Sequence, residues 1–322
     1  IWNKIVIPVT TIVPVGSIFL SLIISYGLME FVGVFMRPVM KPIWKTPGRS
    51  AIDAVASFVG SYSLALLITN RVYKEGKYTT KEAVIIATGF STVSATFMVI
   101  VAKTLDLMDS WNLYFWLTVI VTFLVTAITA RIYPIRNKSD AYFENQEGDI
   151  EKDIPKDKFK VAFNEGMEVC ANSGTILENV IINLKDGVML AFNIGPSLMA
   201  IGTLGIVLAN HTPIFDWIGY LVYPFTLISG FEEPLLTAKA LALGIAEMFL
   251  PAVLVTKLSF EVKMLVAITC VSEVLFFSAS IPCMMATDIP ISFKDYLIIW
   301  FERVVLSILV SIPLIYLVKV LM

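Results

Sequence analysis

Apolar runs separated by short polar breaks dominate the pattern of this chain. A helical run of about twenty apolar residues matches the thickness of a lipid bilayer. Two further stretches are apolar on both sides of a polar break, and we interpret each as a helical hairpin, formed by 30–44 with 51–71 and by 214–228 with 235–256. The remaining long runs predict membrane spans at 5–28, 82–102, 113–132, 187–209, 264–286 and 296–321.

The order of these elements repeats along the chain. A span, a hairpin and two spans precede a polar linker at 135–158, and the same order follows it. Each half crosses the membrane an odd number of times, so the second half is inverted relative to the first. Interrupted helices at matching places in two inverted halves are typical of transporter binding sites. The sequence therefore predicts an all-α polytopic membrane protein of two inverted repeats, each with a helical hairpin and broken helices.

We divide the chain into a first transmembrane repeat at 1–134, the linker at 135–158, an amphipathic interfacial helix at 159–185 and a second, inverted repeat at 186–322. Phe159, Phe163, Met167 and Cys170 recur at helical spacing among polar residues, which predicts the interfacial helix. A cytosolic helix that covers the spans would show the same periodicity. Lys and Arg gather in the linker and in loops on its side, which places the linker in the cytoplasm.

Composition agrees with a membrane protein and excludes other classes. The chain is 57% hydrophobic and 16% charged, with a formal net charge of −2 and no basic block, so nucleic acid is not expected as a partner. No nucleophile elbow, P-loop or H-E-x-x-H motif is present, so we expect no enzyme, no catalytic residue, no metal site and no cofactor. The first run has no cleavage site, which argues against a signal peptide and favours a multi-pass protein of the bacterial cytoplasmic (inner) membrane.

The break at 229–234 (SGFEEP) is the first candidate tip of a hairpin. Two adjacent carboxylates at membrane depth cost roughly 2.5–3.5 kcal/mol each, so a functional reason is expected. Ser229 and Glu232 have the spacing of a helix-starting capping box, with Pro234 in the first turn. Glu232 and Glu233 would face a cavity and neutralise a cation or share a proton. Alternatively, Glu232 only caps its helix and Glu233 pairs with Lys239.

The break at 45–50 (KTPGRS) is the second candidate tip, and it is basic where the other is acidic. Thr46 is a candidate N-cap with Pro47 at the first helical position. Arg49 then lies at a helix N-terminus, where the helix dipole and the guanidinium fork both favour a carboxylate. Alternatively, Arg49 is an ordinary interfacial arginine or pairs with Asp53 one turn later.

Several strings resemble the YjiH family of nucleoside-recognition (Gate) domain membrane proteins. They are 27–33 (GLMEFVG), 47–54 (PGRSAIDA), 213–215 (PIF) and 244–251 (GIAEMFLP). The resemblance implies the fold of concentrative nucleoside transporters, whose hairpin tips and broken helices hold the substrate. Within that wider group, 230–235 (GFEEPL) is similar to a hairpin tip and 88–94 (TGFSTVS) is similar to a glycine-interrupted helix.

These observations predict a transporter, or a subunit of one, for a small polar and dipolar solute (an amino acid, dipeptide or nucleoside) held between the two tips. Na⁺ and H⁺ are the candidate coupling ions. The alternative is a non-transporting membrane sensor or assembly partner. The expected partners are the lipid bilayer, the solute, and a second copy or another membrane subunit. The candidate substrate-binding residues are Thr46, Gly48, Arg49, Ser50, Asp53, Gly89, Ser91, Thr92, Gly230, Glu232, Glu233, Ser272 and Glu273.

Overall fold

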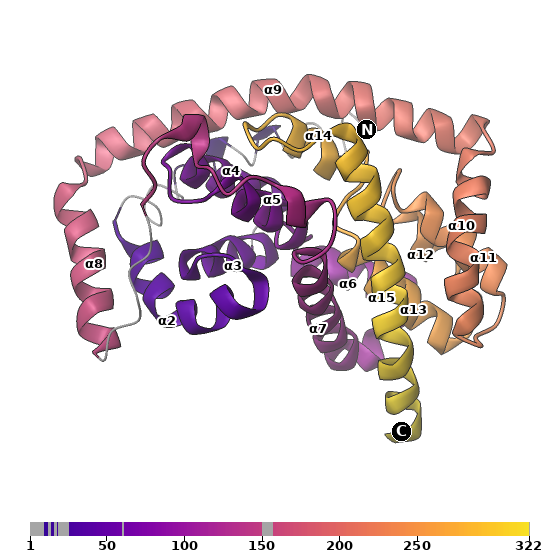
Figure 1. Cartoon of the computed structure of the whole chain (residues 1–322). Coiled ribbons are helices and arrows are strands. Elements are labelled where there is room, and N and C mark those ends of the chain that lie inside the picture. The colour runs from indigo at the N-terminus through magenta and orange to yellow at the C-terminus, as the bar shows by residue number, and fades with distance from the viewer. Residues whose placement is uncertain are drawn as a thin grey trace.

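The computed structural model describes residues 10–11, 14–15, 18, 26–59, 61–149 and 157–321, and this part of the chain is helical, without β-strands. Most of the span predicted at 5–28 lies outside the described residues. The long helix α9 (Ile176–His211) crosses the top of Figure 1, with the other helices below it. Two of the described helices, Met108–Thr129 and Phe293–Lys319, are long and apolar enough to cross a membrane by themselves.

The first half contains one hairpin and one broken helix. The hairpin is formed by α3 and α4, which pack against each other around Ser61, the first hairpin break. The helix that begins with α5 is interrupted at 90–94, the first helix break, before α6 continues. The elements are α2 (Leu28–Trp44), η2 (Gly48–Ser50), α3 (Ala51–Val59), α4 (Tyr62–Lys74), α5 (Thr80–Gly89), α6 (Ala95–Thr104), η3 (Met108–Ser110) and α7 (Trp111–Thr129).

The second half repeats this order. Its hairpin is interrupted at 244–249, the second hairpin break, and its broken helix at 273–279, the second helix break. The second helix break precedes Pro282, which lies inside α14. The elements are α10 (Ile214–Ile228), α11 (Pro234–Leu243), α12 (Leu250–Leu254), α13 (Phe260–Ser272), α14 (Ser280–Met285) and α15 (Phe293–Leu321). The predicted repeat of a hairpin and broken helices is confirmed.

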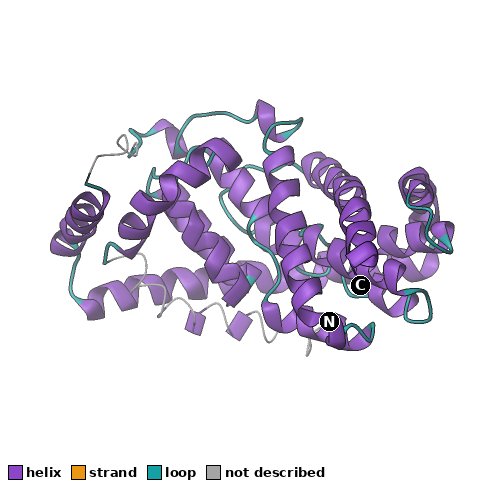
Figure 2. Cartoon of the chain, turned by 90° about the horizontal axis from the view of Figure 1, so that it is seen from below, coloured by secondary structure: helices purple, strands orange, loops and turns teal. Residues whose placement is uncertain are grey.

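Contacts at the helix ends show that the halves are inverted. The start of α5 lies against the linker, because Thr80 N donates to Ala141 O (2.8 Å). The corresponding helix α13 starts at the far end of α15, where Lys319 pairs with Glu261 (2.5 Å). The beginning of α15 lies on the linker side, since Lys138 pairs with Asp295 (2.7 Å). Equivalent helices therefore start on opposite sides of the bundle. Figure 2 shows the helices and the loops between them from below.

The two stretches predicted as tips lie instead at the open ends of the hairpins, where the chain enters each hairpin; we call these ends the hairpin bases. Residues 45–50 connect α2 to the first hairpin on the linker side, and 229–233 connect α10 to the second hairpin on the opposite side. In Figure 1, α2 with α3 and α10 with α11 lie at opposite ends of the molecule, with α7 and α15 between them. The expectation that these two stretches approach each other is wrong. The proline-containing breaks are conspicuous in the sequence, whereas the hairpins turn at short breaks inside apolar segments that were read as continuous.

The predicted helix caps are also corrected. Ser229 is the C-terminal cap of α10, and α11 begins after Glu233, which adopts a left-handed conformation (φ 47°) and supplies no side-chain cap. Thr46 does not cap a helix either, because its hydroxyl accepts a hydrogen bond from Ser50 Oγ (2.9 Å). A capping box does form at Thr79 and Glu82, which together start α5.

Hydroxyl caps restart the chain after both breaks of the first half. Ser61 Oγ accepts from Leu64 N (3.3 Å) at the start of α4, and Ser94 Oγ accepts from Phe97 N (3.4 Å) at the start of α6. A side-chain oxygen at the N-cap satisfies one of the free N–H groups of a helix end. This chemistry allows a helix to begin inside a bundle, away from water.

The part of the linker at 135–149 is packed against the bundle, with short helices at η4 (Ile135–Asn137) and η5 (Phe143–Asn145). Next, α8 (Lys158–Asn172) packs along α2, and Arg37 pairs with Glu165 (2.7 Å) between them. The helix predicted at 159–185 ends at Asn172, because α9 begins separately at Ile176 and runs unbroken through the predicted span at 187–209. Apolar side chains of α8 stay exposed, among them Phe159 (66%).

Candidate functional site

The four breaks meet in the middle of the bundle. Within the first half, Ser57 at the end of α3 donates a hydrogen bond to Thr92 O in the first helix break. Within the second half, Phe277 N donates to Ile245 O (2.6 Å) and Ser278 N to Ala246 O (2.9 Å), which joins the second helix break to the second hairpin break. Interrupted backbone thus finds partners in another interruption, as backbone buried at membrane depth requires.

Aromatic side chains connect the breaks of opposite halves. Tyr62, the first residue of α4, packs against Phe276 of the second helix break, with 5.8 Å between the ring centroids. Phe97 of α6 packs against Phe249 of the second hairpin break at 6.1 Å. Each hairpin therefore contacts the broken helix of the other half, and the meeting point of the four breaks is symmetric between the repeats.

A buried arginine links the two helix breaks. Arg303 of α15 has no solvent exposure; its Nε donates to Ser272 O (2.7 Å) and its Nη1 to Thr126 Oγ1 (3.1 Å). Thr126 Oγ1 in turn donates to Gly89 O (3.0 Å), just before the first helix break. Arg303 is not among the binding residues predicted from the sequence, although an arginine within an apolar run is itself a signal of function.

Glu273 is the corresponding buried acid. It opens the second helix break, has no solvent exposure and accepts a hydrogen bond from Trp300 Nε1 (3.1 Å) through Oε2. Its carboxylate lies against Gly244 of the second hairpin break, where a Cβ atom would stand 2.4 Å from Oε2. Glu247 of the same hairpin break is half-buried, and Phe249 N donates to its Oε1 (3.3 Å). A side chain at position 244 would have to displace this carboxylate, so the glycine allows the close approach of the hairpin.

Several buried polar atoms at this meeting point have no hydrogen-bond partner among the described residues. They are Ser91 Oγ, Glu273 Oε1, Ser278 Oγ and Arg303 Nη2. Buried polar groups in folded proteins are almost always paired, so a cluster of exceptions needs an explanation. Ser91, Glu273 and Ser278 belong to the helix breaks, and Arg303 bonds to Ser272 and Thr126 beside them. We therefore take the meeting point as the candidate binding site.

The structure brings one group of the sequence-predicted site residues together and separates the others. Glu273 and the first helix break belong to the meeting point, and Ser272 bonds to Ser307 on α15 (2.7 Å between hydroxyls) beside it. The predicted residues at or next to the meeting point are Gly89, Ser91, Thr92, Ser272 and Glu273.

The predicted residues of the basic stretch lie at the base of the first hairpin. Arg49 pairs with Asp149 of the linker (2.9 Å). Asp53 accepts hydrogen bonds from Thr69 Oγ1 and Tyr78 OH, both at 2.7 Å. These contacts hold the hairpin base to the linker side, away from the breaks. The predicted residues in this place are Thr46, Gly48, Arg49, Ser50 and Asp53.

The predicted residues of the acidic stretch lie at the base of the second hairpin. Glu232 accepts a hydrogen bond from Ser259 N and so closes the hairpin at its two ends. Gly230 has a positive φ of 66°, and Tyr316 OH donates to the neighbouring Ser229 O (2.7 Å). The alternative pairing of Glu233 with Lys239 is not formed, because Lys239 pairs with Asp216 (2.8 Å).

Close packing at Gly89 gives a first testable prediction. A Cβ atom at this position would stand 2.2 Å from Thr126 Cγ2. We expect Gly89→Ala to lower the free energy of unfolding by about 1–3 kcal/mol, the usual cost of overpacking. Adding Thr126→Ser removes the clashing methyl group and keeps the hydroxyl, so the double variant should regain most of the loss in thermal unfolding. A double variant as unstable as the single one would contradict this packing.

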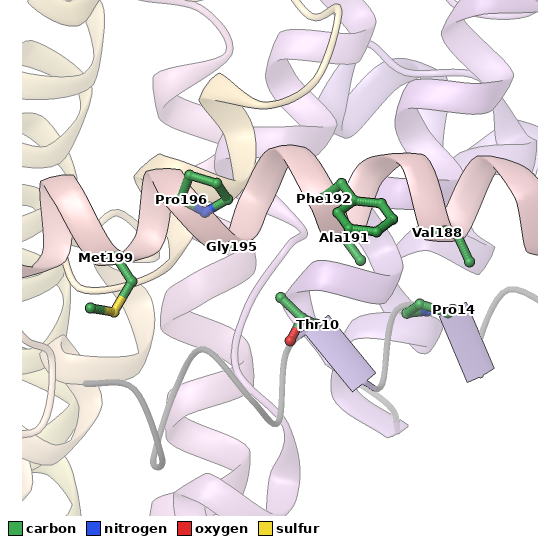
Figure 3. A pocket seen from close by; sticks show the side chains of 8 residues that line it. All are labelled: Thr10, Pro14, Val188, Ala191, Phe192, Gly195, Pro196 and Met199. Carbon is green, nitrogen blue, oxygen red and sulfur yellow. The ribbon is translucent and has the colours of Figure 1, made fainter.

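Two cavities of the described residues have apolar linings. One, of about 460 Å³, lies between α9 and the N-terminal segment and is lined by Thr10, Phe192 and Met199 among others (Figure 3). The other, of about 630 Å³, follows α2 and α3 between Leu28 and Phe123. Neither has a charged lining residue, so neither suits a polar solute. Among the described residues, no group of three acidic, histidine or cysteine side chains could hold a metal ion.

A family comparison matches most of the first half of the chain. The family described as Gate, nucleoside recognition, matches residues 6–108. The chain carries a Gate segment. The Gate segment contains the first hairpin and the first helix break, and its match covers about a third of the chain.

Whole-chain comparisons extend the likeness beyond the Gate segment. An uncharacterized protein of Alkalihalophilus pseudofirmus strain OF4 is 32% identical over 296 residues, which is 91% of this chain and 64% of that protein. An outward-facing structure of a CNTnw variant, a concentrative nucleoside transporter, superposes with a TM-score of 0.67 at 14% identity, over 96% of this chain and 74% of that one. An inward-facing, substrate-bound structure of CNTnw matches with a TM-score of 0.47 at 12% identity, over 94% and 74%.

The Gate segment and the superposition show that the chain has the fold of a concentrative nucleoside transporter and is a multi-pass membrane protein. The identity to CNTnw is too low to carry over its solute. The YjiH family in particular stays a prediction, because the curated relative is described without a family or a function.

Proposed function

We propose that this protein is a membrane transporter, or the transporting subunit of one, that moves a small polar solute through the meeting point of the four breaks. The observation that carries the proposal is the cluster of buried, unpartnered polar atoms where both hairpins and both broken helices converge. Short half-helices around a fixed polar site are the arrangement by which transporters expose that site to each membrane face in turn. The nucleoside-transporter-like fold and the Gate segment support it.

The solute is held between the true hairpin breaks, at Ser61 and 244–249, and the two helix breaks. The stretches that contain Arg49 and Glu232, predicted from the sequence to hold the solute, lie at hairpin bases on opposite sides of the bundle. We further propose that uptake is coupled to Na⁺ or H⁺, because Glu247 and Glu273 bring two carboxylates to the site against the single guanidinium of Arg303. An excess of negative charge favours a monovalent cation there.

We place the protein in the bacterial cytoplasmic membrane, with the linker in the cytoplasm. The bilayer and the solute are the partners the fold requires, and a second copy or another subunit stays a proposal. A non-transporting sensor that binds a ligand at the same site is the alternative function.

Uptake into proteoliposomes tests transport directly. The purified protein is reconstituted and supplied with labelled amino acids, dipeptides and nucleosides under imposed Na⁺ or H⁺ gradients. We expect at least one solute class to accumulate above its outside concentration with one gradient, and collapse of that gradient with an ionophore to abolish accumulation. Binding of a solute without accumulation under either gradient would contradict transport and favour the sensor.

A further inference from the structure

Arg303 uses only part of its hydrogen-bonding capacity. A guanidinium carries five N–H donors in one plane, and here Nε and Nη1 are engaged while Nη2 is buried without a partner. The two engaged atoms fix the plane of the group against Ser272 and Thr126. A buried, oriented guanidinium with a free Nη2 matches the geometry of a carboxylate, which accepts charge-assisted hydrogen bonds from such a fork.

Glu273 carries the charge opposite to that of Arg303, and it also has a buried polar atom without a hydrogen-bond partner. Oε2 is held by Trp300 Nε1, and Oε1 is buried without a partner. A carboxylate oxygen in this state is an acceptor for a strong donor, and an ammonium group offers three donors and the opposite charge. The contact with Gly244 places this carboxylate against the second hairpin, so a group bound to Glu273 touches a moving part of the proposed transporter.

The two charged groups both lie at the start of the second helix break, where Arg303 bonds to Ser272 O beside Glu273, but they do not form an ion pair with each other. A direct contact would satisfy Oε1 and Nη2 together. Their separation leaves one acceptor and one donor group at the same meeting point, beside the unpartnered hydroxyls of Ser91 and Ser278. A ligand that ends in a carboxylate and an ammonium group would satisfy both charges at once, whereas a neutral ligand would leave both without a charged partner.

We propose that the transported solute is a zwitterion of amino-acid or dipeptide type, with its carboxylate bound by Arg303 and its ammonium group bound by Glu273. This assignment rests on the proposal that the meeting point is the solute site, and it replaces the pairing of Arg49 with Glu232 and Glu233 that the sequence suggested. Arg303 and Glu273 belong to one half, while Ser91 and Thr126 of the other half complete the surroundings.

Thermal unfolding of the full chain in detergent tests the proposal with probes that differ by one group. The probes are free amino acids and dipeptides, their C-terminal amides, their N-acetyl derivatives, and uridine and adenosine. A zwitterion at about 100 times its dissociation constant should raise Tm by roughly 5 °C, because a ligand that binds only the folded state stabilises it. The amide and the N-acetyl derivative, each lacking one charge, should lose at least 10-fold in affinity.

Variants then assign the two groups. Glu273→Gln should remove the discrimination between an amino acid and its N-acetyl derivative, and Arg303→Lys should weaken binding of the carboxylate while keeping a positive charge. Glu302→Gln on the same helix, and Arg49→Gln and Glu233→Gln at the hairpin bases, are the matched controls and should bind as the parent does. The comparison of probes on the unaltered protein decides the question even where a variant does not fold.

Stabilisation by uridine or adenosine and by no zwitterion overturns the assignment, and so does a panel in which no zwitterion stabilises the protein. Zwitterion binding that depends on Arg49 and Glu233 rather than on Arg303 and Glu273 also overturns it. A protein that binds zwitterions but accumulates none in proteoliposomes contradicts transport and leaves this binding assignment intact. A protein that accumulates nucleosides contradicts the assignment and leaves transport intact.

Discussion

Arg303→Gln is expected to destabilise the folded protein by about 3–5 kcal/mol, the largest effect of any single substitution considered for this chain. The guanidinium is fully buried, bonds to Ser272 O and Thr126 Oγ1, and is the positive charge beside Glu273. Its removal leaves a buried carboxylate without a compensating charge and two oxygen atoms without a donor. Denaturant unfolding in detergent measures the loss, with Glu302→Gln as the control on the neighbouring residue.

A double-variant cycle separates the charge from the hydrogen bonds. If uncompensated charge dominates the loss, Arg303→Gln with Glu273→Gln should be more stable than Arg303→Gln alone, because neither buried charge then remains. Strictly additive losses would show that Arg303 stabilises the fold through Ser272 and Thr126 only. The same result would weaken the view that Glu273 and Arg303 form one electrostatic unit.

The repeat was predictable from the sequence because it depends on the order of apolar runs, which length and hydropathy alone determine. The first helix break was predictable for a similar reason, since TGFSTVS at 88–94 places a glycine and hydroxyls inside an apolar segment. These residues interrupt a helix through local chemistry, and the structure breaks α5 from α6 at 90–94.

The hairpin breaks were misplaced because proline and charge are stronger local signals than the features that turn the hairpins. The stretches KTPGRS and SGFEEP contain both, and they mark where a chain leaves one helix and enters the hairpin. The second hairpin break, GIAEMF at 244–249, is mostly apolar, and its carbonyl groups accept hydrogen bonds from amide groups of 273–279, about thirty residues later. Such pairing is tertiary, so a local pattern does not reveal it.

Arg303 was missed for a related reason. Adjacent to Glu302, it has the local pattern of a charged pair at the membrane interface. Its burial depends on α7 and α13, which supply Thr126 and Ser272 from distant parts of the chain. The position of Arg303 was nevertheless informative, because it lies ten residues inside the 29-residue helix α15. An arginine at membrane depth is a functional candidate by default.

Transport by variants of the hairpin breaks and of the hairpin bases distinguishes the two locations of the site. Glu247 and Glu273 lie at the second hairpin break and the second helix break, while Arg49 and Glu233 lie at the hairpin bases. A charged group that contacts the solute contributes several kcal/mol of binding, and its loss lowers uptake by roughly 100-fold or more. Arg49 is buried against the linker and Glu233 is exposed at the other hairpin base, and neither lies at a break, so their loss should leave uptake per folded molecule within a small factor of the parent rate.

The initial rate of gradient-driven uptake into proteoliposomes, compared at equal amounts of folded protein, tests the account most directly. We predict that Glu247→Gln and Glu273→Gln reduce the rate by roughly 100-fold, whereas Arg49→Gln and Glu233→Gln transport at a rate close to that of the parent. The account is contradicted if Arg49→Gln and Glu233→Gln abolish uptake while Glu247→Gln and Glu273→Gln leave it unchanged, because the solute would then bind at the hairpin bases and not where the four breaks meet.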